Sequence, residues 1–348
     1  MVERRQGIDL IRFVGVAIIM VAHAGPPDWL FHLRNFGTPL LIVASGLTYA
    51  TIYRDRTLEP WGFYRKRLTR LIFPAWLFLT VFFAFFYVFS KGCGQPLPFS
   101  VWKIPETYLF FNGIGFVWIL QVYIILALIT PVALLFSRWV GSNATYFFCL
   151  LVAYFTYEWL LPELQGLSTA KPNSVWNTTV FSALPYSILF LYGLRLHRLS
   201  TRTVMAIALT CFAVFAGQAM VLHEKYGVFV GIQNYKYPPT FYYLSYGMFA
   251  LNLTYLACRN VVMPDTVGRI VTWLASNSLW IYLWHIFAYY LWEMLLPKAD
   301  GGWGLFLSKV FILFGMGVFT TWLQLSTTRR LLVHRKGTVA RTLANLLS

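Results

Sequence analysis

The sequence predicts an all-α membrane protein, a polytopic helix bundle of about ten transmembrane helices with both termini cytoplasmic. The first observation is composition. The chain of 348 residues is 58% hydrophobic and only 11% charged, whereas soluble domains are about a quarter charged. The second is that apolar runs of about 20 residues, enough to cross a bilayer as a helix, recur along the chain. The third is that Lys and Arg fall mainly in the short segments between those runs, as membrane topology requires.

The apolar runs follow one another without an appended soluble segment, so we expect a single membrane domain over residues 1–348. Turn residues such as Pro26-Pro27 separate them. The first run follows a short basic start and is expected to act as an uncleaved anchor. The predicted spans are Gly7–Gly25, Phe36–Tyr53, Leu71–Phe89, Gly115–Phe136, Tyr146–Leu161, Thr179–Leu194, Val204–Leu222, Thr240–Cys258, Val271–Leu291 and Gly304–Leu325.

The basic residues set the orientation. With the N-terminus inside, nineteen Lys and Arg fall on the cytoplasmic side and seven on the other. Arg12 and Lys309 fall within spans, which completes the 28 in the chain. This bias predicts cytoplasmic termini. Because the charge serves topology, the net charge of +16 does not indicate nucleic-acid binding. The six histidines are scattered and the four cysteines lack metal-site spacing, so we expect no metal and free thiols.

The first span carries ionisable residues at membrane depth. Arg12 and His23 are eleven residues apart, so both point to one side of a helix, roughly 16 Å apart along its axis. Asp9 lies on the same stripe and can pair with Arg12. Such groups cost at least about 2.5 kcal/mol each unless they are paired or line a wet cavity. The stripe therefore predicts a functional site. The alternative is a structural ion pair with a hydrogen-bonded core histidine.

Two further clusters stand out. The predicted loop Trp61–Pro74 carries Arg65, Lys66, Arg67 and Arg70 at the cytoplasmic mouth of the third span. Arg67 and Arg70 are one helical turn apart and could present parallel forks to a phosphate. The alternative is ordinary topology anchoring with contacts to anionic lipid.

The other cluster, Ser276–Ile286, places a second histidine, His285, among aromatic residues of the ninth span. The alternative here is an interfacial aromatic belt with a histidine bonded to backbone or water. No phosphate-binding loop and no serine-hydrolase elbow occurs in the sequence.

An arginine and a histidine on the first span, with ten residues between them, resemble the opening motif of the integral-membrane acyltransferase 3 family, largely bacterial enzymes that O-acylate sugars. Further segments resemble family motifs in the same order along most of the chain. The segments that carry the resemblance are Asp9–His23, Leu40–Leu47, Arg67–Pro74, Trp118–Pro131, Tyr237–Gly247 and Ile281–His285.

The resemblance implies a multi-pass enzyme of the bacterial inner membrane. Such an enzyme moves an acyl group, usually acetyl, from cytoplasmic acetyl-CoA to a hydroxyl of a surface or lipid-linked glycan. We expect His23, Arg12 and Asp9 to form the catalytic set, with His23 as general base or as a transiently acylated nucleophile. Arg12 would line the channel for the thiol-carrying arm, with Asp9 as its partner.

The remaining expectations concern the ligands. Arg67, Arg70, Arg65 and Lys66 would hold the CoA phosphates. Tyr282, Trp284 and His285 would contact the acceptor. A transporter or flippase for a lipid-linked sugar remains the alternative, because polytopic form and intramembrane charges fit it too. The missing internal repeat argues against it.

Overall fold

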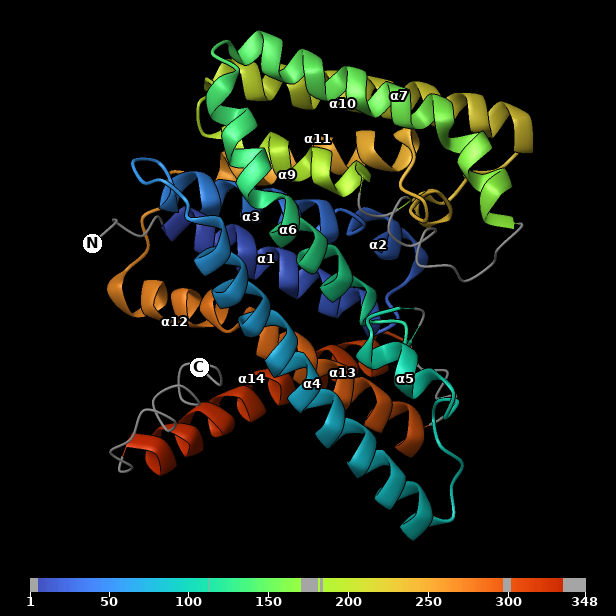
Figure 1. The fold of residues 1–348 in the computed structure, drawn as a ribbon. Coiled ribbons are helices and arrows are strands. Elements are labelled where there is room, and N and C mark those ends of the chain that lie inside the picture. Colours follow the sequence, from blue (N-terminus) through green and yellow to red (C-terminus); the bar gives the residue numbers. More distant parts are fainter. Residues whose placement is uncertain (1–5, 112, 170–180, 182–183, 297–301, 334–348) are drawn as a thin grey trace. The chain divides into compact units, whose positions relative to one another are not determined.

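The computed structural model describes residues 6–111, 113–169, 181, 184–296 and 302–333 (Figure 1). It is 81% helical, and the described residues contain no β strand, so the predicted all-α fold is confirmed. The elements in chain order are α1 Gln6–His23, α2 Asp28–Leu33, α3 Gly37–Ile52, α4 Pro60–Cys93, α5 Lys103–Tyr108, α6 Trp118–Trp139, α7 Asn143–Thr169, α9 Leu184–Leu196, α10 Thr201–Tyr226, η2 Ile232–Tyr235, α11 Phe241–Cys258, α12 Asp265–Ser276, α13 Ser278–Leu295 and α14 Trp303–Val333.

Six of the described helices, α1, α4, α6, α7, α10 and α14, are long and apolar enough to cross a membrane. Helices of this length satisfy their backbone hydrogen bonds internally, as hydrocarbon requires. They point to a multi-pass integral membrane protein. The count of ten spans and the cytoplasmic termini stay predictions. Part of the predicted sixth span and the basic residues at both chain ends lie outside the described residues.

The predicted ninth span, Val271–Leu291, is wrong as a single helix. α12 ends at Ser276 and α13 begins at Ser278. Asn277 between them leaves helical geometry, with φ −102° and ψ 15°, and its side-chain amide donates to the carbonyl of Trp273 at 2.8 Å. Ser and Asn side chains compete with the helix for backbone groups. The polar run 276–278 therefore interrupts the apolar pattern.

Helix α4 begins well before the predicted third span, Leu71–Phe89, because a strong start signal precedes it. Glu59 accepts hydrogen bonds from two backbone N–H groups of the first turn. Pro60 follows at the first helical position, where its fixed φ is suitable. The segment Trp61–Pro74, predicted as a loop, is therefore helical.

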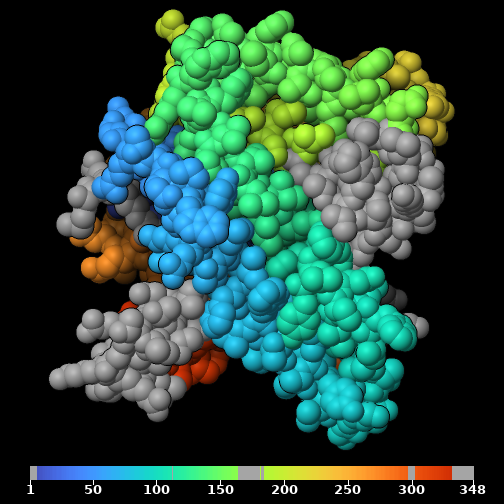
Figure 2. Space-filling view, viewed as in Figure 1, coloured from blue at the N-terminus to red at the C-terminus, as the bar shows by residue number. Residues whose placement is uncertain are grey.

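Much of α4 is open on the face shown in Figure 2, where it runs as a blue-to-cyan strip. Apolar side chains dominate its exposed positions: Trp76 is 47% exposed, Val81 44% and Val88 69%. Large apolar surfaces are unfavourable in water. This side of α4 is suited to contact with lipid chains.

By packing, the chain forms two compact units. The first holds α2, α3, α7, α9, α10 and α11, with α1 as far as Ile19, α6 from Leu128 and α12 as far as Thr272. The second holds α4, α5, α13, α14 and the other parts of those three helices. The prediction of one domain stays a prediction.

In the first unit, α3 and α9 pack closely against each other. A Cβ atom on Gly46 would collide with the carbonyl of Phe190, and one on Gly193 would collide with that of Val43. Small residues allow helix backbones to pack this closely in membranes. α10 lies beside α11 in the same unit (Figure 1).

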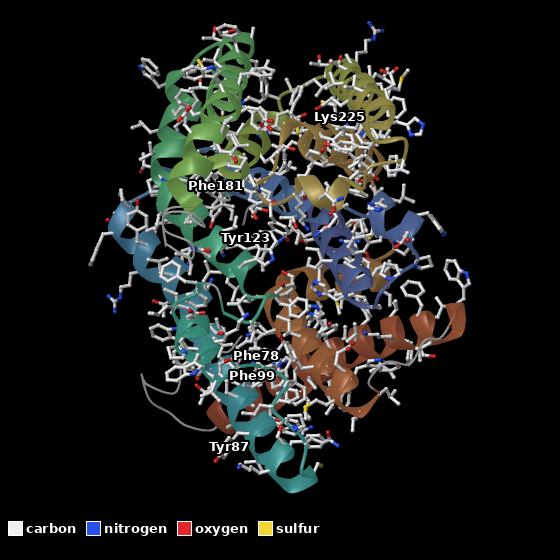
Figure 3. All side chains as sticks on the ribbon, turned by 90° about the vertical axis from the view of Figure 1, so that its right-hand side faces the viewer. Phe78, Tyr87, Phe99, Tyr123, Phe181 and Lys225 are labelled. Carbon is white, nitrogen blue, oxygen red and sulfur yellow. The ribbon has the colours of Figure 1, made fainter. Side chains whose placement is uncertain are left out.

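The second unit is built on aromatic packing between α4 and α13. Phe78, Phe82 and Phe86 of α4 are fully buried. Phe82 contacts Phe99 and Tyr290, with ring centroids 5.7 and 5.3 Å apart. Figure 3 labels Phe78 and Phe99 in this cluster. α14 packs along α13 (Figure 1).

Candidate active site

Two histidines far apart in the sequence meet in the second unit. His23 is the last residue of α1, and His285 lies inside α13. The Nδ1 of His23 is 2.7 Å from the Nε2 of His285, and the ring planes are 4° from parallel. The sequence patterns predicted separate roles for these two residues. The structure joins them in one hydrogen bond.

The hydrogen bonds indicate which ring nitrogens carry protons. His285 is fully buried, and its Nδ1 contacts the carbonyl oxygen of Tyr282. A carbonyl oxygen only accepts, so in the neutral ring Nδ1 donates and Nε2 accepts. His23 then donates from its own Nδ1, which leaves its lone pair on Nε2. That nitrogen can take a proton or attack a carbonyl carbon.

Aromatic rings surround His23. Phe116 meets it edge-on with centroids 4.4 Å apart, and Tyr289 lies 6.4 Å away. The hydroxyl of Tyr282 donates to the backbone carbonyl of Phe116 at 2.7 Å. Tyr282 thus contributes its carbonyl to His285 and its hydroxyl to the backbone beside His23. It supports the histidine pair from both ends.

A positively charged lysine, Lys309, lies close to Tyr289, one of the rings beside the histidine pair. Lys309 of α14 forms an ion pair with Glu293 at 2.6 Å. Its Nζ also lies 4.9 Å from the centroid of Tyr289, the ring next to His23. The ion pair fixes the ammonium group against the aromatic shell of the site.

Trp284, predicted to contact the acceptor, makes contacts to two neighbouring helices. Its indole N–H donates to Gln324 Oε1 at 2.8 Å, and Phe78 meets it edge-on at 5.6 Å. These contacts join α13 to α14 and α4. Its role in binding substrate stays a prediction.

Asp9 and Arg12 belong to the first unit. Asp9 is 4% exposed and accepts a hydrogen bond from the hydroxyl of Thr272 at 3.1 Å. Arg12 is half-buried on α1. Their mutual pairing, and their grouping with His23 as one catalytic set, stay predictions.

The four basic residues predicted to bind phosphate lie near the start of α4, in the second unit. Arg65, Lys66 and Arg70 are exposed, and Arg67 is half-buried. On a helix, residues three apart are neighbours on one face. Arg67 and Arg70 therefore lie one turn apart on α4, and their binding of phosphate stays a prediction.

Two buried cations lie near each other in connecting segments of the first unit. Arg34 and Lys236 are 8% and 7% exposed. Burial, with a smaller contribution from the charge of Arg34, lowers the pKa of Lys236 to about 7. Burial also lowers the pKa of Arg34 to about 10. Lys236 therefore titrates near neutral pH.

A sequence profile described as an acyltransferase domain matches residues 5–325, nearly the whole chain. The chain belongs to the acyltransferase 3 family. No curated protein and no solved structure matches it. The resemblance inferred from the motifs is confirmed, and the protein is a membrane acyltransferase.

The family membership gives the histidine pair of this acyltransferase a chemical context. Acyl transfer needs a group that removes a hydroxyl proton or attacks the donor carbonyl. The Nε2 of His23 can do either. In the described residues, no three His, Cys, Asp or Glu side chains lie close enough to hold a metal.

Sequence reasoning missed two pairings in this candidate site. The bond between His23 and His285 joins residues 262 positions apart. The ion pair of Lys309 and Glu293 joins two helices. All four residues are ionisable and lie in or near apolar runs, where such a group requires a partner. This was the feature of the sequence that could have indicated the pairings.

Proposed function

We propose that this acyltransferase moves an acyl group, acetyl by preference, from cytoplasmic acyl-CoA to a hydroxyl of a surface or lipid-linked glycan. The site is proposed to lie in a bacterial inner membrane. The observation that carries the proposal is the hydrogen bond between His23 and His285. It fixes the tautomer of an imidazole at the end of a membrane-length helix.

With His23 as the general base, the proton taken from the acceptor hydroxyl ends on the thiol of CoA. Its Nε2 removes the proton of the acceptor hydroxyl as the oxygen attacks the thioester carbonyl. The C–S bond then breaks, and the imidazolium returns the proton to the departing thiolate. The products are the glycan ester and free CoA. Exclusion of water by the aromatic shell protects the thioester from hydrolysis.

A covalent route replaces the single transfer by two. The Nε2 of His23 would attack the thioester and release CoA thiolate, and the glycan hydroxyl would then attack the acyl-histidine, its proton matching the one that the thiolate takes up. Incubation with acetyl-CoA and labelled free CoA, without acceptor, separates the routes. Label appearing in acetyl-CoA would indicate the covalent route.

The donor's anionic head is proposed to bind at the start of α4. Arg67 and Arg70, with Arg65 and Lys66, would form charge-assisted hydrogen bonds to its phosphates. Arg12, with Asp9 as partner, would act on the thiol-carrying arm. Tyr282 and Trp284 would contact the acceptor, and His285 would orient it indirectly by holding His23.

Arg67→Gln and Arg70→Gln are each expected to raise the KM for acetyl-CoA by about 10- to 100-fold. A hydrogen bond to a charged group contributes roughly 1.5–3 kcal/mol. Neither change should affect acetyl-pantetheine, which lacks the adenosine phosphates. Steady-state kinetics with both donors measure the difference.

The matched control is Arg329→Gln, because Arg329 is an exposed arginine near the end of α14. It should leave both KM values unchanged. Equal losses for both donors, or an equal effect of the control, would mean that the α4 arginines serve only topology.

The proposed reaction predicts that donor and acceptor are used from opposite faces. His23 lies near the far end of a helix that begins on the predicted cytoplasmic side, about 24 Å beyond Gly7 at roughly 1.5 Å per residue. The bilayer core is roughly 30 Å thick. Inside-out vesicles, with acetyl-CoA outside and host glycan inside, are expected to label the glycan.

Right-side-out vesicles with acetyl-CoA outside provide the control. They should label glycan only after permeabilisation, because CoA does not cross the bilayer. Equal labelling of intact vesicles in both orientations would contradict the proposed geometry. Absence of labelling after permeabilisation in both would contradict the donor or the acceptor.

A further inference from the structure

A basic cavity of about 330 Å³ lies in the first unit, where three helices end. Arg54 follows α3, Arg138 lies in the last turn of α6, and Arg198 follows α9. His197 lies beside Arg198. The nine lining residues include no Asp or Glu; the other members are Ala50, Tyr53, Leu134, Ser137 and Leu194.

The packing of α3 on α9 forms one wall. The close approach at Gly46 and Gly193 leaves no room for a side chain between the two backbones. Beyond that contact, Ala50 and Leu194 line the cavity. The helices that meet here are the second, fourth and sixth predicted spans, all of which end on the predicted cytoplasmic side.

Helix ends explain part of the positive charge. The carbonyls at a helix C-terminus carry a partial negative charge of about half a unit and attract cations. Arg138 stabilises the carbonyls at the end of α3. Its Nη2 donates to the carbonyls of Tyr53 and Arg56, at 2.6 and 2.5 Å.

The end of α6 has its own arginine. The fully buried Arg195 donates to the backbone carbonyls of Ser137, Val140 and Ser142. It also lies over the ring of Tyr146, 4.2 Å from the centroid. The carbonyls at these two helix ends are therefore bonded without Arg54 and Arg198.

The hydrogen bonds and ion pairs that hold the fold together do not account for the charges of Arg54 and Arg198. In the part of the chain that the structure describes, neither side chain has a hydrogen-bond or ion-pair partner. Both face the same cavity as Arg138. Guanidinium groups match phosphate oxygens in geometry and charge. The volume is at the lower end of the range for small-molecule sites, about 300 Å³.

We propose that this cavity binds a phosphate group through Arg54 and Arg198, with Arg138 as a fixed third cation. Two sources share this chemistry on the predicted cytoplasmic side: the head group of an anionic phospholipid and the phosphorylated adenosine of CoA. None of the residues that line it belongs to the basic cluster of α4. Its existence does not require acyl transfer.

The test compares the double variant Arg54→Gln/Arg198→Gln with the control Arg56→Gln/Arg202→Gln. The control removes the same charge from exposed residues that do not line the cavity. One arm measures binding of adenosine 3′,5′-bisphosphate by calorimetry. The other measures phosphatidylglycerol retained from mixed nanodiscs by native mass spectrometry.

Loss of at least about tenfold in either arm, with less than about twofold in the control, would support the site and identify the source of the phosphate. Equal behaviour of the two double variants in both arms would overturn it. Ala50→Leu fills the cavity without changing charge and must reproduce the loss. If the arginine variants fail to fold, the effect of Ala50→Leu on binding decides alone whether the cavity binds phosphate.

These readouts are separate from the proposed function. Binding to the cavity can fail while acetyl transfer and the Arg67 and Arg70 effects persist. If the bisphosphate is lost only from the Arg54 and Arg198 variant, the donor's phosphates bind in the first unit. The assignment of Arg67 and Arg70 would then be wrong.

Discussion

His23→Ala is expected to lower kcat for acyl transfer by about 10²- to 10⁴-fold. A positioned general base contributes an effect of this size, and the substitution removes the only nitrogen that the hydrogen-bonded pair leaves as acceptor. His23 is half-buried at a helix end, so a smaller side chain should leave α1 folded. Transfer of labelled acetyl groups by purified protein in nanodiscs measures the loss.

The matched control for this prediction is His223→Ala. His223 is an exposed histidine in the last turn of α10 and should retain full activity when replaced. Unfolding temperature and elution volume must match the native protein for both variants. Product formation by His23→Ala at the rate of the control would show that His23 takes no part in the reaction.

The fold class could be predicted because a bilayer permits few structures. Apolar runs of helical length and flanking basic residues are enough to indicate a helix bundle. Where a helix begins and ends depends on local competition between side chains and the helix for backbone hydrogen bonds. The capping by Glu59 and Pro60 extends α4 beyond the apolar run, and Asn277 divides a run that remains hydrophobic on average.

The individual site residues could be found, but not their partners. His23 and His285 each stood out because an imidazole in an apolar span is costly. Their contact depends on how the end of α1 packs against α13, and no local pattern specifies it. Arg195 shows the opposite case. It counted as a loop charge in the topology, yet it is fully buried with backbone partners.

His285→Phe is expected to lower kcat by about 10²- to 10⁴-fold while the KM for acetyl-CoA changes less than about twofold. His285 does not touch the reacting atoms in the proposed mechanism. It is a positioning residue, whose Nε2 holds the proton of His23 on Nδ1. Phe fills a similar volume and removes that acceptor. Loss of tautomer control in a comparable hydrogen-bonded triad costs up to about 10⁴-fold.

His285→Gln separates positioning from packing. The amide oxygen of Gln can reach the place of Nε2 and accept from His23, so it should restore at least about tenfold of the activity lost in His285→Phe. Because the position is fully buried, a residue needed only for packing would favour the apolar Phe. Phe activity equal to or above Gln activity, at matched unfolding temperatures, would show that His285 only fills space. The order Gln above Phe, with unchanged KM, would assign it to holding the proton of His23 in place.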